Sequence, residues 1–279
     1  MAEHLQSDAE AMTAATPEVA TAATPSVSSV VVLAYFAVLF ALVSVSSFLH
    51  KSPTVDEPVH LTAGYASLKL GDFRLNPEHP PLAKLWAALP LLALDLKPPR
   101  NKSPVWGRVT ENLIPGPTTE AAHDFAFVDN NAETLFFFAK LQMVLLAIVL
   151  GSFVYLWTTQ LFGQMAGLVA LTIFALDPNI LAHSQIVHTD VPFAAFFFIG
   201  TYFLWRYVHV ASWPNLLGLC LFGGLAAATK YSYSIMLLIW LTLAALNIFS
   251  AEPQISLLSG TPTAAGRRQK TVLAAAGFL

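Results

Sequence analysis

Long, largely uncharged hydrophobic segments recur along most of the chain. Each of them is near the ~20 residues that an α-helix needs to cross a bilayer. The predicted spans cover residues 30–50, 134–157, 163–182, 191–210, 214–229 and 231–250. This pattern predicts an all-α polytopic membrane protein whose transmembrane domain is a helix bundle over residues 30–250.

The two ends of the chain depart from this pattern. Residues 1–29 are rich in Ala, Thr, Ser, Pro and Glu and contain neither Lys nor Arg, which predicts a disordered tail. The apolar run over 30–49 is too long for a secretory signal, so we interpret it as a retained anchor. Residues 271–279 are too few to cross a bilayer and are expected to form a truncated seventh span.

The composition agrees with a membrane protein and excludes several other classes. The chain is 56% hydrophobic and 11% charged, whereas about a quarter of the residues of soluble domains are charged. A net charge of −3 gives no basic footprint for nucleic acid. The single cysteine, Cys220, excludes an internal disulfide and a cysteine-based metal cluster.

Counting the spans between polar segments shows which of them share a side of the membrane. The long loop 51–133, residues 183–190 and the turn at Lys230 all face the side opposite to the tail. The basic residues of the short segments on the tail's side are Arg206, Arg267, Arg268 and Lys270. Because basic residues in short loops favour the cytoplasm, the tail and loop 251–270 are predicted to be cytoplasmic. The long loop is then extracytoplasmic.

Two adjacent acids, Asp56 and Glu57, open the long loop just beyond the first span. A helix is predicted from there to Leu70, with Gly71 as its stop. One interpretation is structural, because Thr54 and Glu57 have capping-box spacing and acids in a first helical turn suit the helix dipole. The other is functional, because a carboxylate at the membrane surface is a candidate general base.

A second motif in the long loop combines an acid, two bases and two prolines. Pro80-Pro81 predicts the start of an apolar helix over residues 82–94 that lies in the membrane interface. Glu78, His79 and Lys84 then gather at the N-terminal end of this helix, where an anion such as phosphate is favoured. A snorkelling lysine on an interfacial helix is the alternative interpretation of Lys84.

Ionisable residues also gather between the third and fourth spans, at His183, His188 and Asp190. Asp190 can be interpreted as an N-cap of the fourth span, and Lys230 as an interfacial anchor. Ionisable groups at membrane depth are nevertheless functional candidates by default. His188 and Asp190, together with Asp56, are candidate ligands of a divalent metal. Lys230 is a candidate cation for a lipid phosphate.

The order of these motifs resembles the order found in a known protein family. It runs Asp-Glu after the first span, Gly-Asp-x-Arg and Glu-His-Pro-Pro-Leu-x-Lys in the long loop, Thr-Asp-Val-Pro at the fourth span, and Ala-Thr-Lys-Tyr-Ser at the fifth. Over about residues 30–250 the chain resembles the N-terminal half of the protein O-mannosyltransferase-like family (glycosyltransferase family 39, GT-C superfamily). The chain also resembles the related aminoarabinose transferases of lipid A. It implies a GT-C-like helix bundle with a long first extracytoplasmic loop that contains interfacial helices.

The resemblance also implies a function, namely a glycosyltransferase in the plasma (inner) membrane. Its donor is a polyprenyl-phosphate sugar, and its acceptor is a hydroxyl on a protein, lipid or glycan at the extracytoplasmic face. Asp56 is then the candidate catalytic base, with Glu57 beside it and Asp190 as the second acidic position. The candidate residues for binding the donor phosphate are Arg74, Glu78, His79, Lys84 and Lys230. GT-C enzymes differ in metal use, so a divalent metal is a candidate cofactor.

Two other functions stay open, a transporter or flippase and a non-catalytic remnant of such an enzyme. Transporters usually place ionisable groups near the membrane midplane, in broken helices. Here the charges gather at span ends and in one long loop, which favours the enzyme.

For the enzyme, attack on the anomeric carbon from the side opposite the lipid phosphate would invert the sugar's configuration.

Overall fold

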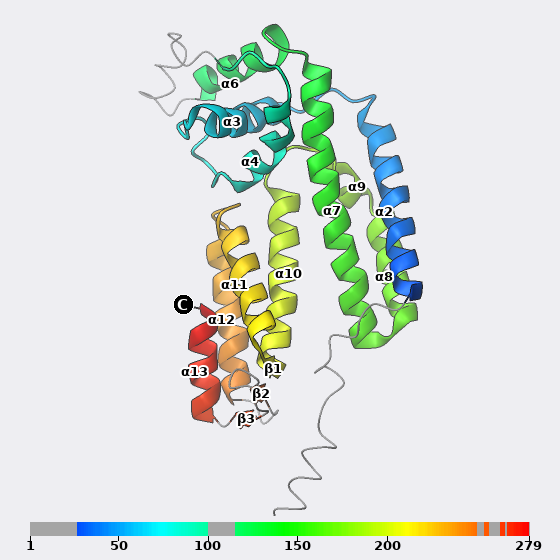
Figure 1. Cartoon of the computed structure of the whole chain (residues 1–279), viewed down its shortest axis with the longest axis vertical. Helices are drawn as coiled ribbons and strands as arrows, with labels where there is room; N and C mark the ends of the chain where they lie inside the picture. The colour runs from blue at the N-terminus through cyan, green and yellow to red at the C-terminus, as the bar shows by residue number, and fades with distance from the viewer. Residues whose placement is uncertain (1–26, 100–114, 250–253, 257–262, 266, 279) are drawn as a thin grey trace, which may run out of the picture. The chain divides into compact units, whose positions relative to one another are not determined.

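A computed structural model describes residues 27–99, 115–249, 254–256, 263–265 and 267–278 (Figure 1). Almost all described residues in regular structure are helical, which confirms the predicted all-α fold. Three strands of two or three residues form a small sheet in the order β1-β2-β3, which the sequence did not predict. Most of the predicted tail 1–29 and half of the loop 251–270 lie outside the described residues, as does Trp106 of the long loop.

The helices and strands follow one another along the chain with these bounds. The elements are α2 Val27–Phe48, α3 Glu57–Leu70, α4 Leu82–Ala88, η2 Leu89–Ala93, α6 Pro115–His123, η3 Asp124–Val128, α7 Ala132–Phe162, α8 Gln164–Leu176, α9 Pro178–His183, α10 Asp190–His209, β1 Val210–Ala211, α11 Trp213–Ala227, α12 Tyr233–Phe249, β2 Gln254–Ser256, β3 Thr263–Ala265 and α13 Arg267–Phe278.

Each predicted span coincides with helical residues, but the spans differ in length. Among the described residues, α2, α7 and α10 are long and apolar enough to cross a membrane. The apolar helices α8, α11 and α12 are shorter. The prediction of one continuous helix over 163–182 is wrong, because α8 ends at Leu176 and α9 begins at Pro178. Asp177 caps α9 by accepting bonds from the backbone N–H groups of Asn179 and Ile180 at 2.8 and 2.9 Å.

The chain divides into two compact units. Unit 2 consists of residues 33–199 and 222–236, and unit 1 of residues 1–32, 200–221 and 237–279. In unit 1, the Tyr207 hydroxyl donates to the Leu273 carbonyl at 3.0 Å and thereby ties α10 to α13. The Trp240 indole N–H donates to the Thr201 hydroxyl at 3.0 Å and ties α12 to α10.

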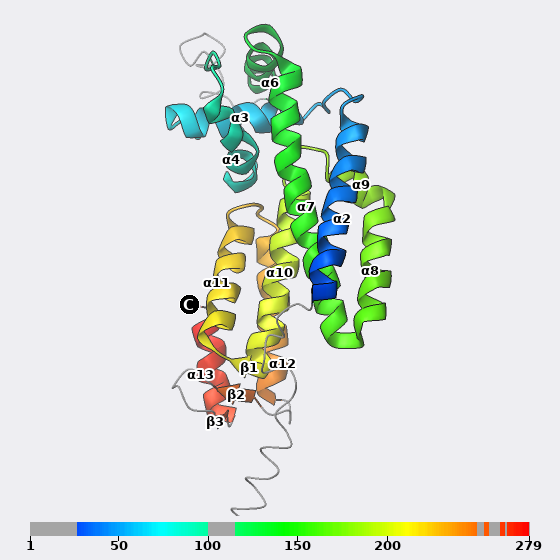
Figure 2. The ribbon, with the colours of Figure 1, turned by 45° about the vertical axis from the view of Figure 1, so that its right-hand side comes forward.

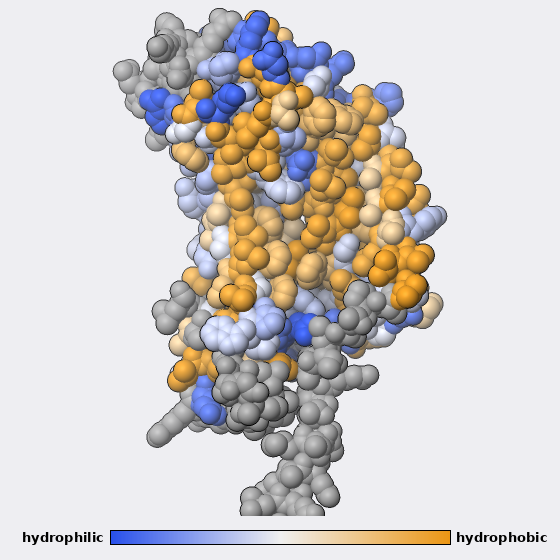
Figure 3. Space-filling view, in the orientation of Figure 1, coloured by the Kyte–Doolittle hydropathy of each residue, from blue (hydrophilic) through white to orange (hydrophobic). Residues whose placement is uncertain are grey.

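Unit 2 contains α7 flanked by α2 and α8, which lie side by side in both Figure 1 and Figure 2. The rings of Phe36, Phe40 and Phe174 form a cluster between α2 and α8, with centroids 5.4 to 6.2 Å apart. Gly151 of α7 makes this approach possible, because a Cβ there would lie 2.5 Å from Phe36 and 2.7 Å from Phe174. The outer faces of these helices are hydrophobic (Figure 3), as expected for contact with lipid.

The long loop has a hydrophobic core of its own within unit 2. Helix α3 crosses the direction of α7 (Figures 1 and 2), and Leu61 and Tyr65 of α3 are buried among side chains of η2, η3 and α7. Helix α3 ends at Leu70, and Gly71 follows with φ 66°, which confirms the predicted stop. Gly64 lets α3 approach α4, because a Cβ there would lie 2.0 Å from the Lys84 carbonyl oxygen.

Candidate active site

Glu57, the first residue of α3, is completely buried and joins three parts of unit 2. Its carboxylate accepts bonds from the backbone N–H groups of Thr54 at 2.6 Å and Val187 at 3.0 Å. The Lys140 ammonium on α7 lies 3.6 Å from the same carboxylate. The bond to Thr54 has the i to i+3 spacing of a capping box, but the N-cap of α3 is Asp56 and not Thr54. The bond to Val187 holds the linker between α9 and α10 against α3.

Asp56 differs from Glu57 in its hydrogen bonding and in its exposure. It occupies the N-cap position of α3, yet its side chain makes no capping hydrogen bond. The side chain is exposed, whereas that of Glu57 is buried. Of the two adjacent acids, Asp56 therefore has the carboxylate that a molecule outside the protein can reach.

Lys84 lies in the first turn of α4 and is 5% exposed. Its ammonium donates to the carbonyl oxygens of Asn76 at 2.6 Å and His79 at 2.8 Å, and to the Asn76 side-chain oxygen at 3.3 Å. Burial lowers the pKa of Lys84 to about 8. Lys84 therefore organises the turn that carries His79, and its donors are already engaged by that turn.

His79 stacks on His60 of α3, with ring centroids 6.0 Å apart and planes inclined by 18°. Burial, followed by the nearby Lys84, lowers the pKa of His60 to about 4. Burial and the charge of Lys230 also lower the pKa of His79. The Nδ1 atoms of both rings are buried and have no hydrogen-bond partner among the described residues. Both imidazoles are therefore neutral near pH 7.

His60 was not among the candidate residues predicted from the sequence. Its position three residues after Glu57 places both side chains on one face of α3, and this spacing is the signal that could have found it. Its stacking on His79 depends on the fold of the long loop, which a local pattern does not contain.

Asp190 and Lys230 form an ion pair between the first residue of α10 and the turn after α11. The side chain of Asp190 is 52% exposed and that of Lys230 is 27% exposed. The Leu82 N–H donates to the Ala228 carbonyl at 3.0 Å, which brings the start of α4 against the same turn. The structure thus brings together the second motif of the long loop and the Lys230 turn.

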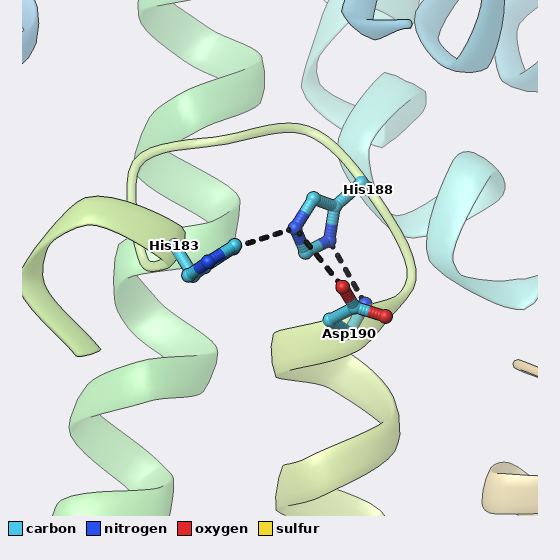
Figure 4. Close-up of side chains that lie close together, drawn as sticks. All are labelled: His183, His188 and Asp190. Carbon is cyan, nitrogen blue, oxygen red and sulfur yellow. Dashed lines mark hydrogen bonds and ion pairs between the residues drawn. The ribbon is translucent and has the colours of Figure 1, made fainter. Parts of the chain in front are cut away.

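His183, His188 and Asp190 lie together at the linker between α9 and α10 (Figure 4). The His188 Nε2 atom is 3.1 Å from the His183 Nδ1 atom and 3.5 Å from Asp190 Oδ2. The Asp190 N–H donates to His188 Nδ1 at 2.9 Å, so the neutral ring carries its proton on Nε2. Burial lowers the pKa of His188, which favours this neutral ring.

The sequence named Asp56, His188 and Asp190 as candidate metal ligands. The structure brings His188 and Asp190 together and adds His183, while Asp56 is not part of this group. His183 joins this group because the short helix α9 turns the chain, so that its last residue, His183, faces His188 across the linker.

Two further candidates for binding phosphate are exposed on the long loop. Arg74 is already paired with Asp72, whose Oδ1 atom accepts from the guanidinium Nε at 2.8 Å. Glu78 is exposed, one residue before His79. Of the five predicted residues, His79, Lys84 and Lys230 therefore lie around one turn, Glu78 is exposed next to His79, and Arg74 has a local partner.

A cavity of about 460 Å³ opens beside Lys140, between the end of α2 and the start of α7. Phe48 and Phe137 form part of its wall and meet edge to face, with ring centroids 5.9 Å apart. Lys51 and Glu133 contribute charge to the same lining. A cavity that combines aromatic rings with charged groups suits an amphiphilic molecule.

Comparison with known proteins gives one match. Residues 127–259 match the family model of dolichyl-phosphate-mannose-protein mannosyltransferases. The matched segment contains Lys140, His188, Asp190 and Lys230, while Asp56 precedes it. No curated protein and no solved structure matches the chain.

The match and the helices lead to the same class of protein. Together, α2, α7, α10 and the shorter apolar helices make the chain a multi-pass membrane protein. The predicted resemblance is confirmed over residues 127–259, where the chain is similar to the mannosyltransferase-like membrane glycosyltransferases of the GT-C type.

Proposed function

We propose that this protein transfers a sugar from a polyprenyl-phosphate donor to a hydroxyl acceptor at the extracytoplasmic face of the membrane. The family match supports a mannosyltransferase-like glycosyltransferase. The observation that carries the proposal is the meeting of Asp190, Lys230 and the His79 turn, which come from three polar segments between apolar helices. A polyprenyl chain stays in the bilayer, so its phosphosugar head lies at the depth of these helix ends.

The donor phosphate is bound next to Lys230 in this proposal. Lys230 is partly exposed, and its partner Asp190 is also exposed, so the pair can open toward a ligand at little cost. Lys84 donates to two backbone carbonyls and contributes positive charge without direct contact. The stacked, neutral imidazoles of His60 and His79 line the same turn and shape the surface next to Lys230.

Asp56 is the proposed general base. Its exposed carboxylate takes the proton of the acceptor hydroxyl as that oxygen attacks the anomeric carbon of the sugar. The bond between the anomeric carbon and the phosphate oxygen breaks, and the lipid phosphate leaves with the bonding electrons. Positive charge at Lys230 stabilises this leaving group. Attack from the opposite side inverts the configuration of the sugar.

Glu57 has a positioning role in this scheme. Its carboxylate is buried and already accepts bonds from Thr54 and Val187, with Lys140 nearby. These partners fix the position of the carboxylate, and its burial leaves it inaccessible to an acceptor.

Substitution of Asp56 by Asn tests the assignment. The change should lower transfer from a polyprenyl-phosphate mannose donor by at least about a hundredfold, because positioned acid–base help is worth 10²–10⁴-fold. Thermal stability should stay unchanged, since the side chain makes no capping bond. Asp95→Asn, at another exposed aspartate of unit 2, is the matched control and should keep full activity. Turnover of the Asp56→Asn variant at the wild-type rate would exclude Asp56 as the base.

A further inference from the structure

We infer that His183, His188 and Asp190 form a binding site for a divalent transition-metal ion of the Zn²⁺ class. Each residue offers one ligand atom, and these atoms lie within 4.8 Å of one another (Figure 4). Two imidazole nitrogens and one carboxylate oxygen form a ligand set that suits Zn²⁺ better than Mg²⁺ or Ca²⁺, which prefer oxygen ligands.

The separations of the ligand atoms fit one tetrahedral ion. Bonds of about 2.0–2.1 Å from zinc to nitrogen or oxygen place neighbouring ligand atoms about 3.3–3.4 Å apart. The observed separations are 3.1 Å between the two imidazole nitrogens and 3.5 Å between His188 Nε2 and Asp190 Oδ2. These two separations, both measured from His188, are close to the tetrahedral values, and the ligand atoms of His183 and Asp190 lie within 4.8 Å of each other. An ion beside His188 can therefore replace the direct contacts if these two exposed side chains move together.

The backbone around the cluster is already fixed. His183 is the last residue of α9 and Asp190 is the first of α10, so both ends of the linker belong to helices. In the middle of the linker, the Val187 N–H donates to the buried Glu57 carboxylate, and the His188 N–H donates to the Ile186 carbonyl. Ligands held by a rigid backbone lose less conformational entropy when an ion binds.

Binding of the ion leaves the ion pair of Lys230 with Asp190 in place but changes the tautomer of His188. Lys230 pairs with Asp190 Oδ1, which leaves Oδ2 for the ion. The ion takes the place of the proton on His188 Nε2, and the proton then resides on Nδ1. Nδ1–H and the Asp190 N–H are then both donors, so the His188 ring shifts until they no longer face each other. The Asp190 N–H is then left to water, as are other N–H groups in a first helical turn.

Three protein ligands leave a fourth position open on a tetrahedral ion. This position lies at the exposed side of the cluster, since His183 and Asp190 are both exposed. It would take water or another oxygen ligand. The inference does not rest on the proposed function, because binding of the ion can be measured without a sugar donor.

The test measures metal binding to the full-length protein, purified in detergent with a tag that contains no histidine. Zn²⁺ is titrated in competition with a coloured chelator, and Co²⁺ is added in parallel because its visible absorption reports tetrahedral coordination. The wild type should bind one ion per chain with a tetrahedral Co²⁺ spectrum. His183→Asn should weaken binding at least tenfold, because an imidazole ligand is lost.

His123→Asn is the matched control for this experiment. His123 is an exposed histidine 3.7 Å from the Asp124 carboxylate, so it reproduces a His–Asp neighbour pair without a third ligand. This variant should bind the ion as the wild type does. Lys230→Met should bind it more tightly, because removal of the cation frees both oxygens of Asp190. Absence of binding to the wild type, or equal affinity of the His183→Asn variant, would overturn the inference.

Discussion

Glu57 is the residue whose substitution should affect the folded state most. Its carboxylate has no exposed surface and is the common partner of the Thr54 N–H, the Val187 N–H and the Lys140 ammonium. Replacement by Ala removes the acceptor from all three groups at once. The Val187 N–H and the Lys140 ammonium then remain buried with no acceptor supplied by residue 57, whereas Thr54 is exposed and its N–H can bond to water.

The magnitude follows from the burial of these groups. Removing one member of a buried ion pair costs about 3–5 kcal/mol, because the other charge stays buried without compensation. Glu57→Ala should therefore lower the free energy of unfolding by about 3–5 kcal/mol. Glu57→Gln keeps the shape and one acceptor, but its NH₂ group must face a donor. This isosteric change should cost about 1–3 kcal/mol, the penalty for one unsatisfied buried group.

Equilibrium unfolding in mixed micelles provides the measurement, with Glu133→Gln as the control at an exposed acid. Lys140→Met and the double variant with Glu57→Gln complete a double-mutant cycle, whose coupling energy should be about 0.5–3 kcal/mol. Hydrogen exchange at the Val187 amide should accelerate in Glu57→Ala, since that N–H loses its acceptor. A loss for Glu57→Ala no larger than that of the control would refute the role of Glu57.

Four other substitutions give separate predictions. Stability should fall by about 3 kcal/mol as the pH drops from 6.5 to 4, because the unfolded chain protonates His60 while the buried ring, with its pKa of about 4, stays neutral. His60→Asn should flatten this pH dependence in unfolding titrations. Gly64→Ala should destabilise by about 1–3 kcal/mol, because its Cβ would meet backbone atoms at 2.0 and 2.5 Å. Gly224→Ala, whose Cβ meets nothing within 4 Å, should instead stabilise α11 by about 0.5–1 kcal/mol in the same thermal assay. Lys230→Met should change stability by less than about 1 kcal/mol, since its pair with Asp190 is partly exposed. It should nevertheless slow transfer by about a hundredfold or more, as loss of transition-state stabilisation does.

The helices of this protein could be predicted because hydrophobic length and local stop signals are properties of short segments. The stop of α3 at Gly71 is an example, since a residue with φ 66° after Leu70 favours glycine. The break between α8 and α9 could also have been seen, because Asp177-Pro178 is a cap followed by a residue that begins helices. The small sheet could not, because β1 and β2 belong to segments more than forty residues apart that pair for only two residues.

The candidate site was predictable in its composition and less so in its geometry. The count of spans placed Asp190, Lys230 and the long loop on one side of the membrane, and the ion pair and the contact of Leu82 with Ala228 agree with it. However, counting the spans gives no distances between side chains. It did not distinguish Lys84, which donates to backbone carbonyls, from Lys230, whose partner is an exposed carboxylate.

Asp56 and Glu57 show most clearly what a local sequence pattern cannot predict, because adjacent side chains at a helix start point in different directions. The sequence offered capping and catalysis as alternatives for the pair as a whole. In the structure Glu57 accepts from the Thr54 N–H and from the N–H of Val187, a residue 130 positions away that no local pattern could reveal. Asp56 makes no capping bond and stays exposed. The two substitutions should therefore separate: Glu57→Ala should act chiefly on folding and Asp56→Asn chiefly on turnover. Equal effects of both changes on both measurements would mean that the pair acts as a single unit.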